Sequence, residues 1–110
     1  DNNEVCKAIT SMLENSDPKP DAVLAASPRF GMLTVKSCHM LNIKIPHDIR
    51  IVAVGSSKFF DLIHPPLSSI ELPLYDMGFK AAEMILKNID EGAVEELSVL
   101  ASEFIIRESS

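Results

Sequence analysis

Residues 22–55 read AVLAASPRFGMLTVKSCHMLNIKIPHDIRIVAVG, and this stretch decides the fold of the 110-residue chain. It begins and ends with two apolar runs, residues 22–26 and 51–54, which lack polar alternation and are therefore typical of strands buried on both faces. Between them, Ser27 is a capping residue and Pro28 suits the first helical position, after which apolar residues recur at helical spacing. A strand, a helix and a strand of these lengths predict two parallel strands joined by a crossover helix.

The segment before this stretch predicts another helix. Residues 3–15 carry an apolar stripe at helical spacing, and either Asn2 or Asn3 can cap it. No strand precedes this helix, and two parallel strands are too few for an independent sheet. We therefore expect the chain to be the C-terminal part of a larger α/β protein that supplies further strands.

The segment after this stretch predicts one more helix and several short strands. Residues 67–72 alternate as a strand does, and a helix is expected from Leu74 to about Ile89, followed by a turn at Gly92. Residues 97–101 and 104–106 are expected to form short strands.

Composition and charge exclude several classes of protein. The net charge is −6, and no cluster of Lys and Arg offers a surface for nucleic acid. The two cysteines, Cys6 and Cys38, cannot build a disulfide scaffold or a zinc site. We expect no metal, no cofactor and no membrane association, because histidine pairs, a glycine-rich phosphate loop and a long apolar run are all missing from the sequence. The composition predicts that the protein acts in a reducing compartment.

The chemistry-bearing residues follow the two predicted parallel strands. Ligands of open parallel sheets bind beyond the carboxyl ends of the strands, and the N-terminus of a helix there favours oxygen-rich or anionic ligands. If the two strands are neighbours, one crevice is lined by Ser27, Arg29, Phe30, Ser56, Ser57 and Lys58. The alternative is that Ser27 only caps the helix and that Ser56 and Ser57 only turn the chain.

A catalytic role is not expected. The sequence Gly55-Ser56-Ser57-Lys58 would need a glycine in place of Phe59 to form a nucleophile elbow. The sequence offers no evident Ser/His/Asp arrangement, so we expect no catalytic residue and no enzyme activity.

Four segments of the chain form a recognisable set: PDAVLAA at 20–26, NIKIPHDIRIVAVG at 42–55, PPLSSIELPLYDMGFKAAEMIL at 65–86 and FIIRESS at 104–110. Together they resemble the C-terminal half of lactose-repressor (LacI/GalR) type transcriptional regulators. The resemblance implies an α/β, parallel-sheet, periplasmic-binding-protein-like type I core with an effector between two subdomains. It places residues 1–72 in the C-terminal effector-binding subdomain, with its crossover strand. Residues 73–110 then belong to the N-terminal subdomain, with the last strand returning.

The resemblance also gives roles to the crevice residues. The family often has Ala-Ala-Asn-Asp where this chain has Ala25-Ala26-Ser27-Pro28, and Gly-Phe/Tyr-Asp-Asp where it has Gly55-Ser56-Ser57-Lys58. The family's asparagine falls on Ser27 and its first aspartate on Ser57, and both typically contact ligand hydroxyls. The loss of both, with the gain of Arg29 and Lys58, favours an effector that is more anionic or otherwise different, or the absence of a small effector.

Further residues are implicated in assembly and in movement. By resemblance, the helix from Pro28 and the loop of residues 61–66 carry dimer contacts, with Met32 and Ile63 near the positions used; the alternative is that both fill the local core. The resemblance also implies that Glu71, Leu72 and Pro73 form the crossover at which the two subdomains hinge.

The resemblance therefore implies a region that senses a small, sugar-like effector and dimerises in a cytoplasmic regulator. Operator DNA would be bound only through an N-terminal helix-turn-helix domain outside this chain, and a homodimer is expected. The alternative is a solute-binding protein of a sugar transport system, which shares the fold.

Overall fold

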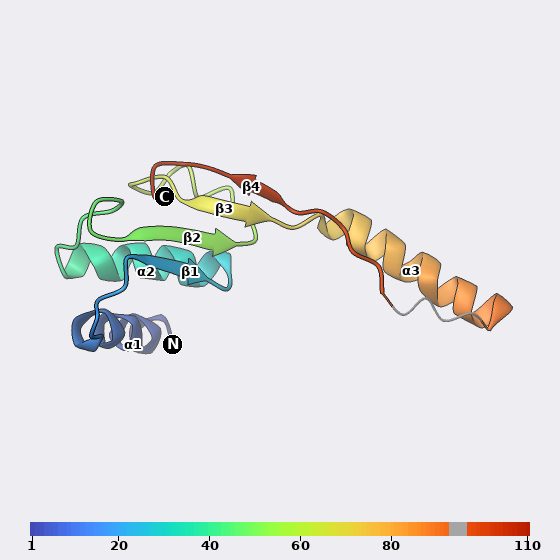
Figure 1. The fold of residues 1–110 in the computed structure, drawn as a ribbon, viewed down its shortest axis with the longest axis horizontal. Coiled ribbons are helices and arrows are strands. Elements are labelled where there is room, and N and C mark those ends of the chain that lie inside the picture. Colours follow the sequence, from blue (N-terminus) through green and yellow to red (C-terminus); the bar gives the residue numbers. More distant parts are fainter. Residues whose placement is uncertain (93–96) are drawn as a thin grey trace. The chain divides into compact units, whose positions relative to one another are not determined.

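The computed structural model describes residues 1–92 and 97–110 of the chain. Its helices and strands, in chain order, are α1 (Asn2–Asn15), β1 (Ala22–Ala25), α2 (Pro28–Met40), β2 (Arg50–Val54), β3 (Ser68–Glu71), α3 (Leu74–Glu91) and β4 (Glu103–Ile105) (Figure 1). The strands form one sheet in the order β1-β2-β3-β4. The chain divides into two compact units: unit 1 comprises Asp1–Glu71 with Phe104–Ser110, and unit 2 comprises Leu72–Glu103.

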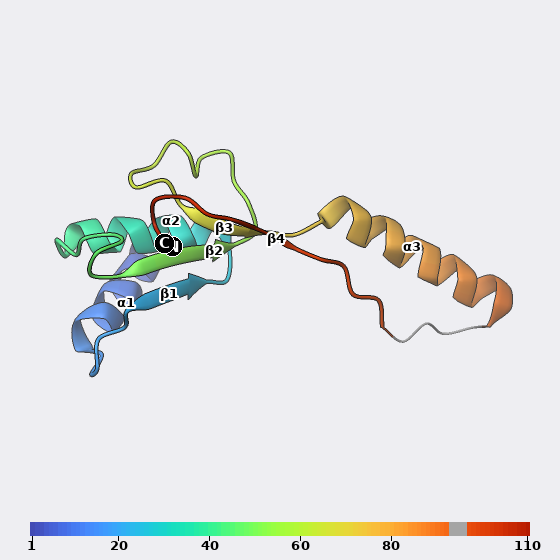
Figure 2. The ribbon, with the colours of Figure 1, turned by 45° about the horizontal axis from the view of Figure 1, so that its top comes forward.

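The first three strands run parallel, which confirms the predicted α/β class. Val23 of β1 lies opposite Ile51 of β2, and Ala53 of β2 lies opposite Ser69 of β3. Figure 2 shows the three arrows pointing the same way, with the connection of residues 55–67 arching from the end of β2 back to the start of β3. The carboxyl ends of β1 and β2 therefore meet at one edge of the sheet.

Helix α2 packs very closely on the sheet because Gly31 carries no side chain. A Cβ atom at Gly31 would lie 2.8 Å from both Ala53 Cβ and Leu67 Cδ2, closer than carbon atoms pack. The helix ends at Met40, and two residues later Asn42 adopts a left-handed backbone with φ of 56°, a conformation that asparagine tolerates. This close packing holds the N-terminus of α2 against the strand ends.

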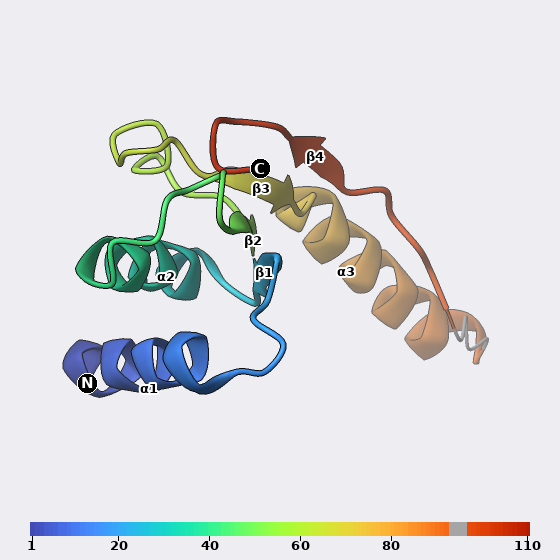
Figure 3. The same ribbon diagram turned by 60° about the vertical axis from the view of Figure 1, so that its left-hand side comes forward.

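Helix α1 packs against α2 rather than against the sheet. Its buried side chains are Cys6 and Leu13, and the Ser37 hydroxyl of α2 donates to the Cys6 carbonyl at 3.5 Å. Asp1 caps the helix by accepting a hydrogen bond from the Asn3 amide at 3.2 Å, where Asn2 or Asn3 was the expected cap. Figure 3 shows α1 and α2 on the same side of the sheet.

The prediction that β1 is buried on both faces is wrong for the part of the chain that the structure describes. Ala25 is buried under α2, whereas Leu24, which points to the opposite face, is 65% exposed. In unit 1, the described helices cover one face of the sheet, so successive side chains of β1 differ in burial.

The C-terminal tail is held to the sheet by a network of hydroxyl groups that we call the serine seam: Ser68, Ser69, Ser109 and Ser110. Ser109 is fully buried; its hydroxyl donates to the Ile51 carbonyl at 2.6 Å and accepts from the Ser68 amide at 2.8 Å. The Ser68 hydroxyl in turn accepts from the Arg107 amide at 2.8 Å. The seam fixes the tail across β2 and β3.

Arg107 ties the loop of residues 55–67 to the same seam. Its Nε donates to Asp61 Oδ1 at 2.7 Å, and its Nη1 donates to the Leu67 carbonyl and the Ser69 hydroxyl, each at 3.0 Å. A single guanidinium thus joins the tail, the loop and β3, which suits its rigid fork of donors.

Unit 2 contains α3, which has no buried residue among those described. The helix begins at Leu74 as predicted, and Gly92, with φ of 65°, ends it in the left-handed conformation expected of a C-cap glycine. The predicted strand of residues 97–101 is absent from the described structure. Residues 93–96, which fall within the predicted 73–110 segment, lie outside the described residues. The last predicted strand is present at Glu103–Ile105.

Candidate functional site

The carboxyl ends of β1 and β2 are brought into direct contact. A Cβ atom at Gly55, directly after β2, would lie 3.2 Å from the ring of Pro28, the first residue of α2. Gly55 also has φ of 84°, a conformation that side-chain-bearing residues rarely adopt, and its amide donates to the Ile70 carbonyl at 2.8 Å. The structure therefore places the start of α2 beside Gly55, and β1 and β2 are neighbours in the sheet, which is the condition stated for one crevice.

Ser27 caps α2. Its backbone is extended, with φ of −157°, and its hydroxyl oxygen accepts a hydrogen bond from the Phe30 amide at 3.3 Å. This bond uses the oxygen and leaves the hydroxyl proton for donation, because a hydroxyl both accepts and donates. The capping role and a ligand-binding role are thus compatible.

Arg29 is engaged by the first helix. Its Nε and Nη2 atoms donate to Asn2 Oδ1 at 2.9 and 2.6 Å, and its guanidinium lies 5.8 Å from the centre of the Phe30 ring. Both contacts are at the surface and compete with water, so little free energy is needed to exchange them for contacts with a ligand. The cation is held close to the N-terminus of α2.

Ser57 and Lys58 occupy the facing loop. The Ser57 hydroxyl accepts from the Phe59 amide at 3.3 Å, and Lys58 Nζ lies 5.6 Å from the centre of the Phe59 ring. The loop is anchored by the next residue, since Phe60 is fully buried and its amide donates to the Ser57 carbonyl at 3.0 Å. Ser56, which precedes Ser57 in the chain, is exposed.

The residues assigned to assembly and hinge lie on α2, on the loop of residues 55–67 and at the end of β3. Met32 and Ile63 are partly buried and pack against the core of unit 1. The division between the two units falls between Glu71 and Leu72, so Glu71 belongs to unit 1 and Leu72 and Pro73 belong to unit 2. The returning chain crosses the same division between Glu103 and Phe104.

The serine seam is the feature that the sequence reasoning missed. Ser68 and Ser69 are buried although serine is usually exposed, and their partners lie about forty residues later in the chain. A signal was present, because two adjacent serines between Leu67 and Ile70 in a strand must place at least one hydroxyl toward the core, where it needs a partner.

One ionisable group of unit 1, the Cys38 thiol, has a strongly shifted pKa. Burial raises the pKa of this thiol to about 11, so it is protonated and unreactive at neutral pH.

In the described ranges 1–92 and 97–110, no group of three or more His, Cys, Asp and Glu side chains is placed to hold a metal ion. No helix in those ranges combines the length and the apolarity needed to span a bilayer.

Comparison with known proteins gives a consistent picture. Residues 2–110 match the model of the periplasmic binding protein-like domain. The ribose operon repressor of Lactococcus lactis is 32% identical over 107 residues, which cover 96% of this chain and 32% of the repressor. The sucrose operon repressor of Streptococcus mutans is 32% identical over 82 residues, which cover 74% of this chain and 25% of the repressor.

The solved structures agree with these sequence relatives. A LacI family transcriptional regulator from Bifidobacterium animalis superposes with a TM-score of 0.84 at 25% identity, covering 99% of this chain and 40% of that protein. The chain therefore spans about a third of the length of the ribose operon repressor and two fifths of this solved structure.

Proposed function

The chain belongs to the periplasmic binding protein-like domain family, and from this membership we propose that it forms part of the effector-binding core of a lactose-repressor type transcriptional regulator. The observation that carries the proposal is the contact of Gly55 with Pro28, which joins the ends of two parallel strands beside a capped helix N-terminus. That edge is where open parallel sheets bind ligands. The relatives are operon repressors, which favours a regulator over a transport protein.

In this proposal the crevice residues bind the effector by donating hydrogen bonds. The hydroxyls of Ser27 and Ser57 each accept a hydrogen bond from one backbone amide, and each keeps its proton for donation to the ligand. Arg29 and Lys58 add positive charge, and the N-terminus of α2 adds its exposed amides. A wall rich in donors suits a ligand rich in acceptors, so we propose a sugar-like effector that carries a carboxylate or a phosphate.

The two units would move relative to each other when the effector binds. We propose that unit 1 belongs to the C-terminal subdomain and unit 2 to the N-terminal one, with the chain crossing between them at Glu71, Leu72 and Pro73. The binding of the effector would favour the closed arrangement by its differential affinity, typically about 1–3 kcal/mol. Operator DNA would be contacted by a separate domain of the whole protein, which would act in the cytoplasm.

We further propose that the whole protein is a homodimer that joins through α2 and the loop of residues 61–66. On these segments, Met40 is 62% exposed and Leu62 is 78% exposed, and exposed apolar side chains suit a partner surface. The variant Leu62→Glu should then sediment with more monomer than the wild type. The control variant Met12→Glu, on α1, should not; equal dimer content in all three would contradict this surface.

The test of the main proposal is ligand binding by the full-length protein. A thermal-shift screen should include neutral sugars, sugar acids and sugar phosphates, because a ligand at a hundred times its Kd stabilises by about 2.7 kcal/mol. We expect the largest shift from an anionic sugar. We also expect Ser57→Ala and Lys58→Gln to weaken binding at least about fivefold, since each removes a donor, while Ser102→Ala leaves it unchanged.

Two results would contradict the proposal. One is a stabilising sugar whose affinity is unaffected by both variants. The other is turnover of a sugar by the wild-type protein that Ser57→Ala abolishes, which would show a catalytic serine where we propose a binding one.

A further inference from the structure

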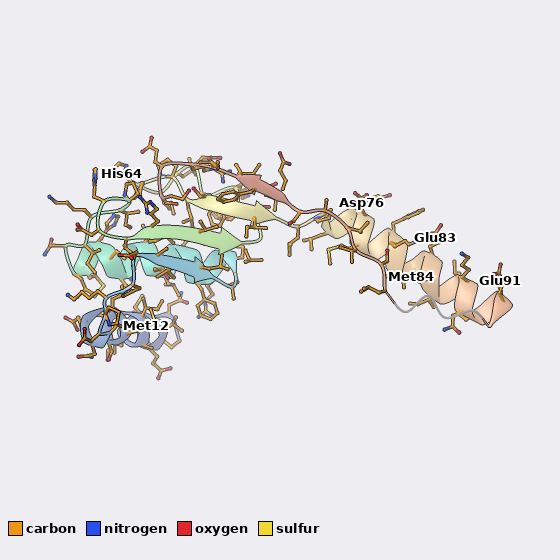
Figure 4. All side chains as sticks on the ribbon, viewed as in Figure 1. Met12, His64, Asp76, Glu83, Met84 and Glu91 are labelled. Atoms are coloured by element: carbon orange, nitrogen blue, oxygen red, sulfur yellow. The ribbon has the colours of Figure 1, made fainter. Side chains whose placement is uncertain are left out.

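The loop of residues 55–67 begins at the crevice and contains no helix or strand to hold its shape. It carries Ser57, which the proposed function assigns to effector binding. Figure 4 labels His64, which belongs to the same loop. The side chains that the loop buries are those of Phe60, Pro65 and Leu67. A segment with few buried side chains opens easily unless other contacts hold it.

Two backbone hydrogen bonds centred on Phe60 set the conformation of this loop. The Phe60 amide donates to the Ser57 carbonyl, and the Leu67 amide donates to the Phe60 carbonyl, each at 3.0 Å. The Ser57 hydroxyl accepts from the Phe59 amide at 3.3 Å, so its orientation depends on the same turn. A shift of Phe60 or Leu67 would therefore move Ser57 as well.

Arg107, from the C-terminal tail, holds the loop on both sides of this turn. Its Nε donates to Asp61 Oδ1 at 2.7 Å, directly after Phe60, and its Nη1 donates to the Leu67 carbonyl at 3.0 Å. The Arg107 side chain is only 17% exposed, whereas that of Asp61 is 68% exposed. Three hydrogen bonds in series thus lead from Arg107 through Leu67 and Phe60 to Ser57.

The tail is itself firmly attached, so Arg107 is a fixed point for the loop. The Arg107 amide donates to the Ser68 hydroxyl at 2.8 Å, and the amide of the buried Ser109 donates to the Pro66 carbonyl at 3.0 Å. These contacts do not involve Asp61. Removal of the Asp61 carboxylate would therefore weaken the hold on the loop and leave the tail in place.

We propose that Arg107 is a positioning residue for effector binding: through Asp61 and Leu67 it keeps the loop in the conformation in which Ser57 donates to the effector. This inference rests on the function proposed above. Arg107 acts through Ser57 and not by contact with the effector. A loop that is already in its binding conformation loses less conformational entropy when the effector binds, and this raises the affinity.

Asp61→Ala is the sharpest variant, because Arg107 also holds the tail and its own replacement would disturb more than the loop. In the full-length protein without added sugar, the Phe60 and Leu67 amides should exchange hydrogen at least about threefold faster in Asp61→Ala. The amides of α1 should exchange at the wild-type rate. Unchanged exchange at both Phe60 and Leu67 would overturn the proposal.

Asp61→Asn is the conservative variant. Its side-chain oxygen can still accept from Arg107 Nε, so its exchange rates and its affinity for sugar should stay close to those of the wild type. An Asp61→Asn protein as impaired as Asp61→Ala would contradict an anchor that works by this hydrogen bond.

Calorimetric titration separates positioning from a general loss of stability. The probe is whichever of glucuronate, glucose 1-phosphate and glucose stabilises the wild-type protein most. Asp61→Ala should weaken binding of this probe at least about threefold in the wild type, but less than about 1.5-fold in Ser57→Ala, where the positioned hydroxyl is gone. In Arg29→Gln, which alters a crevice residue on α2, the threefold effect should remain.

The two backgrounds make the outcome decisive. A loss of stability or of dimer content would weaken binding equally in both, so equal effects of Asp61→Ala in Ser57→Ala and in Arg29→Gln would overturn the positioning role. If Ser57→Ala alone leaves the affinity unchanged, the proposed function fails and this role fails with it. If Ser57→Ala weakens binding and Asp61→Ala does not, only the positioning role fails.

Discussion

Phe60 in unit 1 is fully buried, whereas Phe79 in unit 2 is 65% exposed. The same contrast holds for whole elements, because α2 buries six residues while α3, the longer helix, buries none of those described. The apolar side chains exposed on α3 include Leu74, Met77, Ile85, Leu86 and Ile89. Unit 1 therefore makes its own core.

The contrast teaches that an amphipathic stripe specifies a helix without specifying its partner. A helix with one strongly apolar face is typical of one that packs against protein. In unit 1 the partners of α2 are the sheet on one side and α1. In unit 2 the stripe of α3 remains open, as expected if it packs against parts of the whole protein beyond the span of this chain, which covers about a third of the ribose operon repressor.

Truncation of the two phenylalanines should give the largest difference between the units. Phe60→Ala removes a fully buried ring and should lower the free energy of unfolding of unit 1 by about 3–5 kcal/mol. Phe79→Ala should lower the stability of this chain by less than about 1 kcal/mol, because its ring is mostly in water. Urea denaturation followed by circular dichroism measures both. Equal losses would mean that unit 2 has a core of its own.

Removal of the buried hydroxyl of the serine seam should have the next largest effect. Ser109→Ala leaves the Ser68 amide and the Ile51 carbonyl without this partner, which should cost about 2–4 kcal/mol. Ser102→Ala, at an exposed position in unit 2, is the control and should change the free energy of unfolding by less than about 0.5 kcal/mol. If Ser109→Ala is as stable as the control, the tail is not held by this network.

The Cys38 thiol makes the stability of unit 1 depend on pH in the alkaline range. Its pKa is raised by burial to about 11, so between the ordinary cysteine pKa and that value the folded state holds a proton that the unfolded state releases. The stabilising contribution is present below this range and is lost as the pH rises through it, because the unfolded state binds fewer protons there. Stability should thus fall more steeply from about pH 9 to 11 in the wild type than in Cys38→Ala. Parallel profiles in thermal denaturation would contradict the assignment.

Two glycines of unit 2 should give the smallest effects, with opposite signs. Gly78 lies inside α3 with nothing within 4 Å of a Cβ atom, so Gly78→Ala should raise the stability of the helix by about 0.5–1 kcal/mol. Gly92 has φ of 65°, so Gly92→Ala should lower it by about 1 kcal/mol despite the same open space. The helical signal at elevated temperature compares the two, and changes of the same sign would contradict the described end of α3.

Local chemistry made much of the fold predictable. The Ser27-Pro28 start of α2, the Gly92 end of α3 and the parallel pairing of the two apolar runs all follow from short-range signals, and all three are confirmed. The cap of α1 was misplaced by one or two residues, because Asp1, Asn2 and Asn3 are all good capping residues.

Long-range features were not predictable from one sequence. The burial of Ser109 depends on Ser68 and Ile51, which lie far from it in the chain, and no local pattern announces that pairing. The exposure of Leu24 depends on which elements cover the second face of the sheet, and its apolar neighbours alone cannot show this. For the crevice, the sequence supplied the residues and the topological rule, and the binding roles of Ser27, Arg29, Phe30, Ser56, Ser57 and Lys58 stay predictions.

The most direct measurement of these roles is amide hydrogen exchange of the full-length protein, with and without the sugar that stabilises it most. The proposed crevice predicts slower exchange on binding at Arg29 and Phe30 and at Ser56–Lys58, because a ligand there would cover their amides. The amides of α1 and of the turn Lys44–Asp48 should exchange at the same rate in both states. Protection at α1 or at that turn, with none at Ser56–Lys58, would contradict the account.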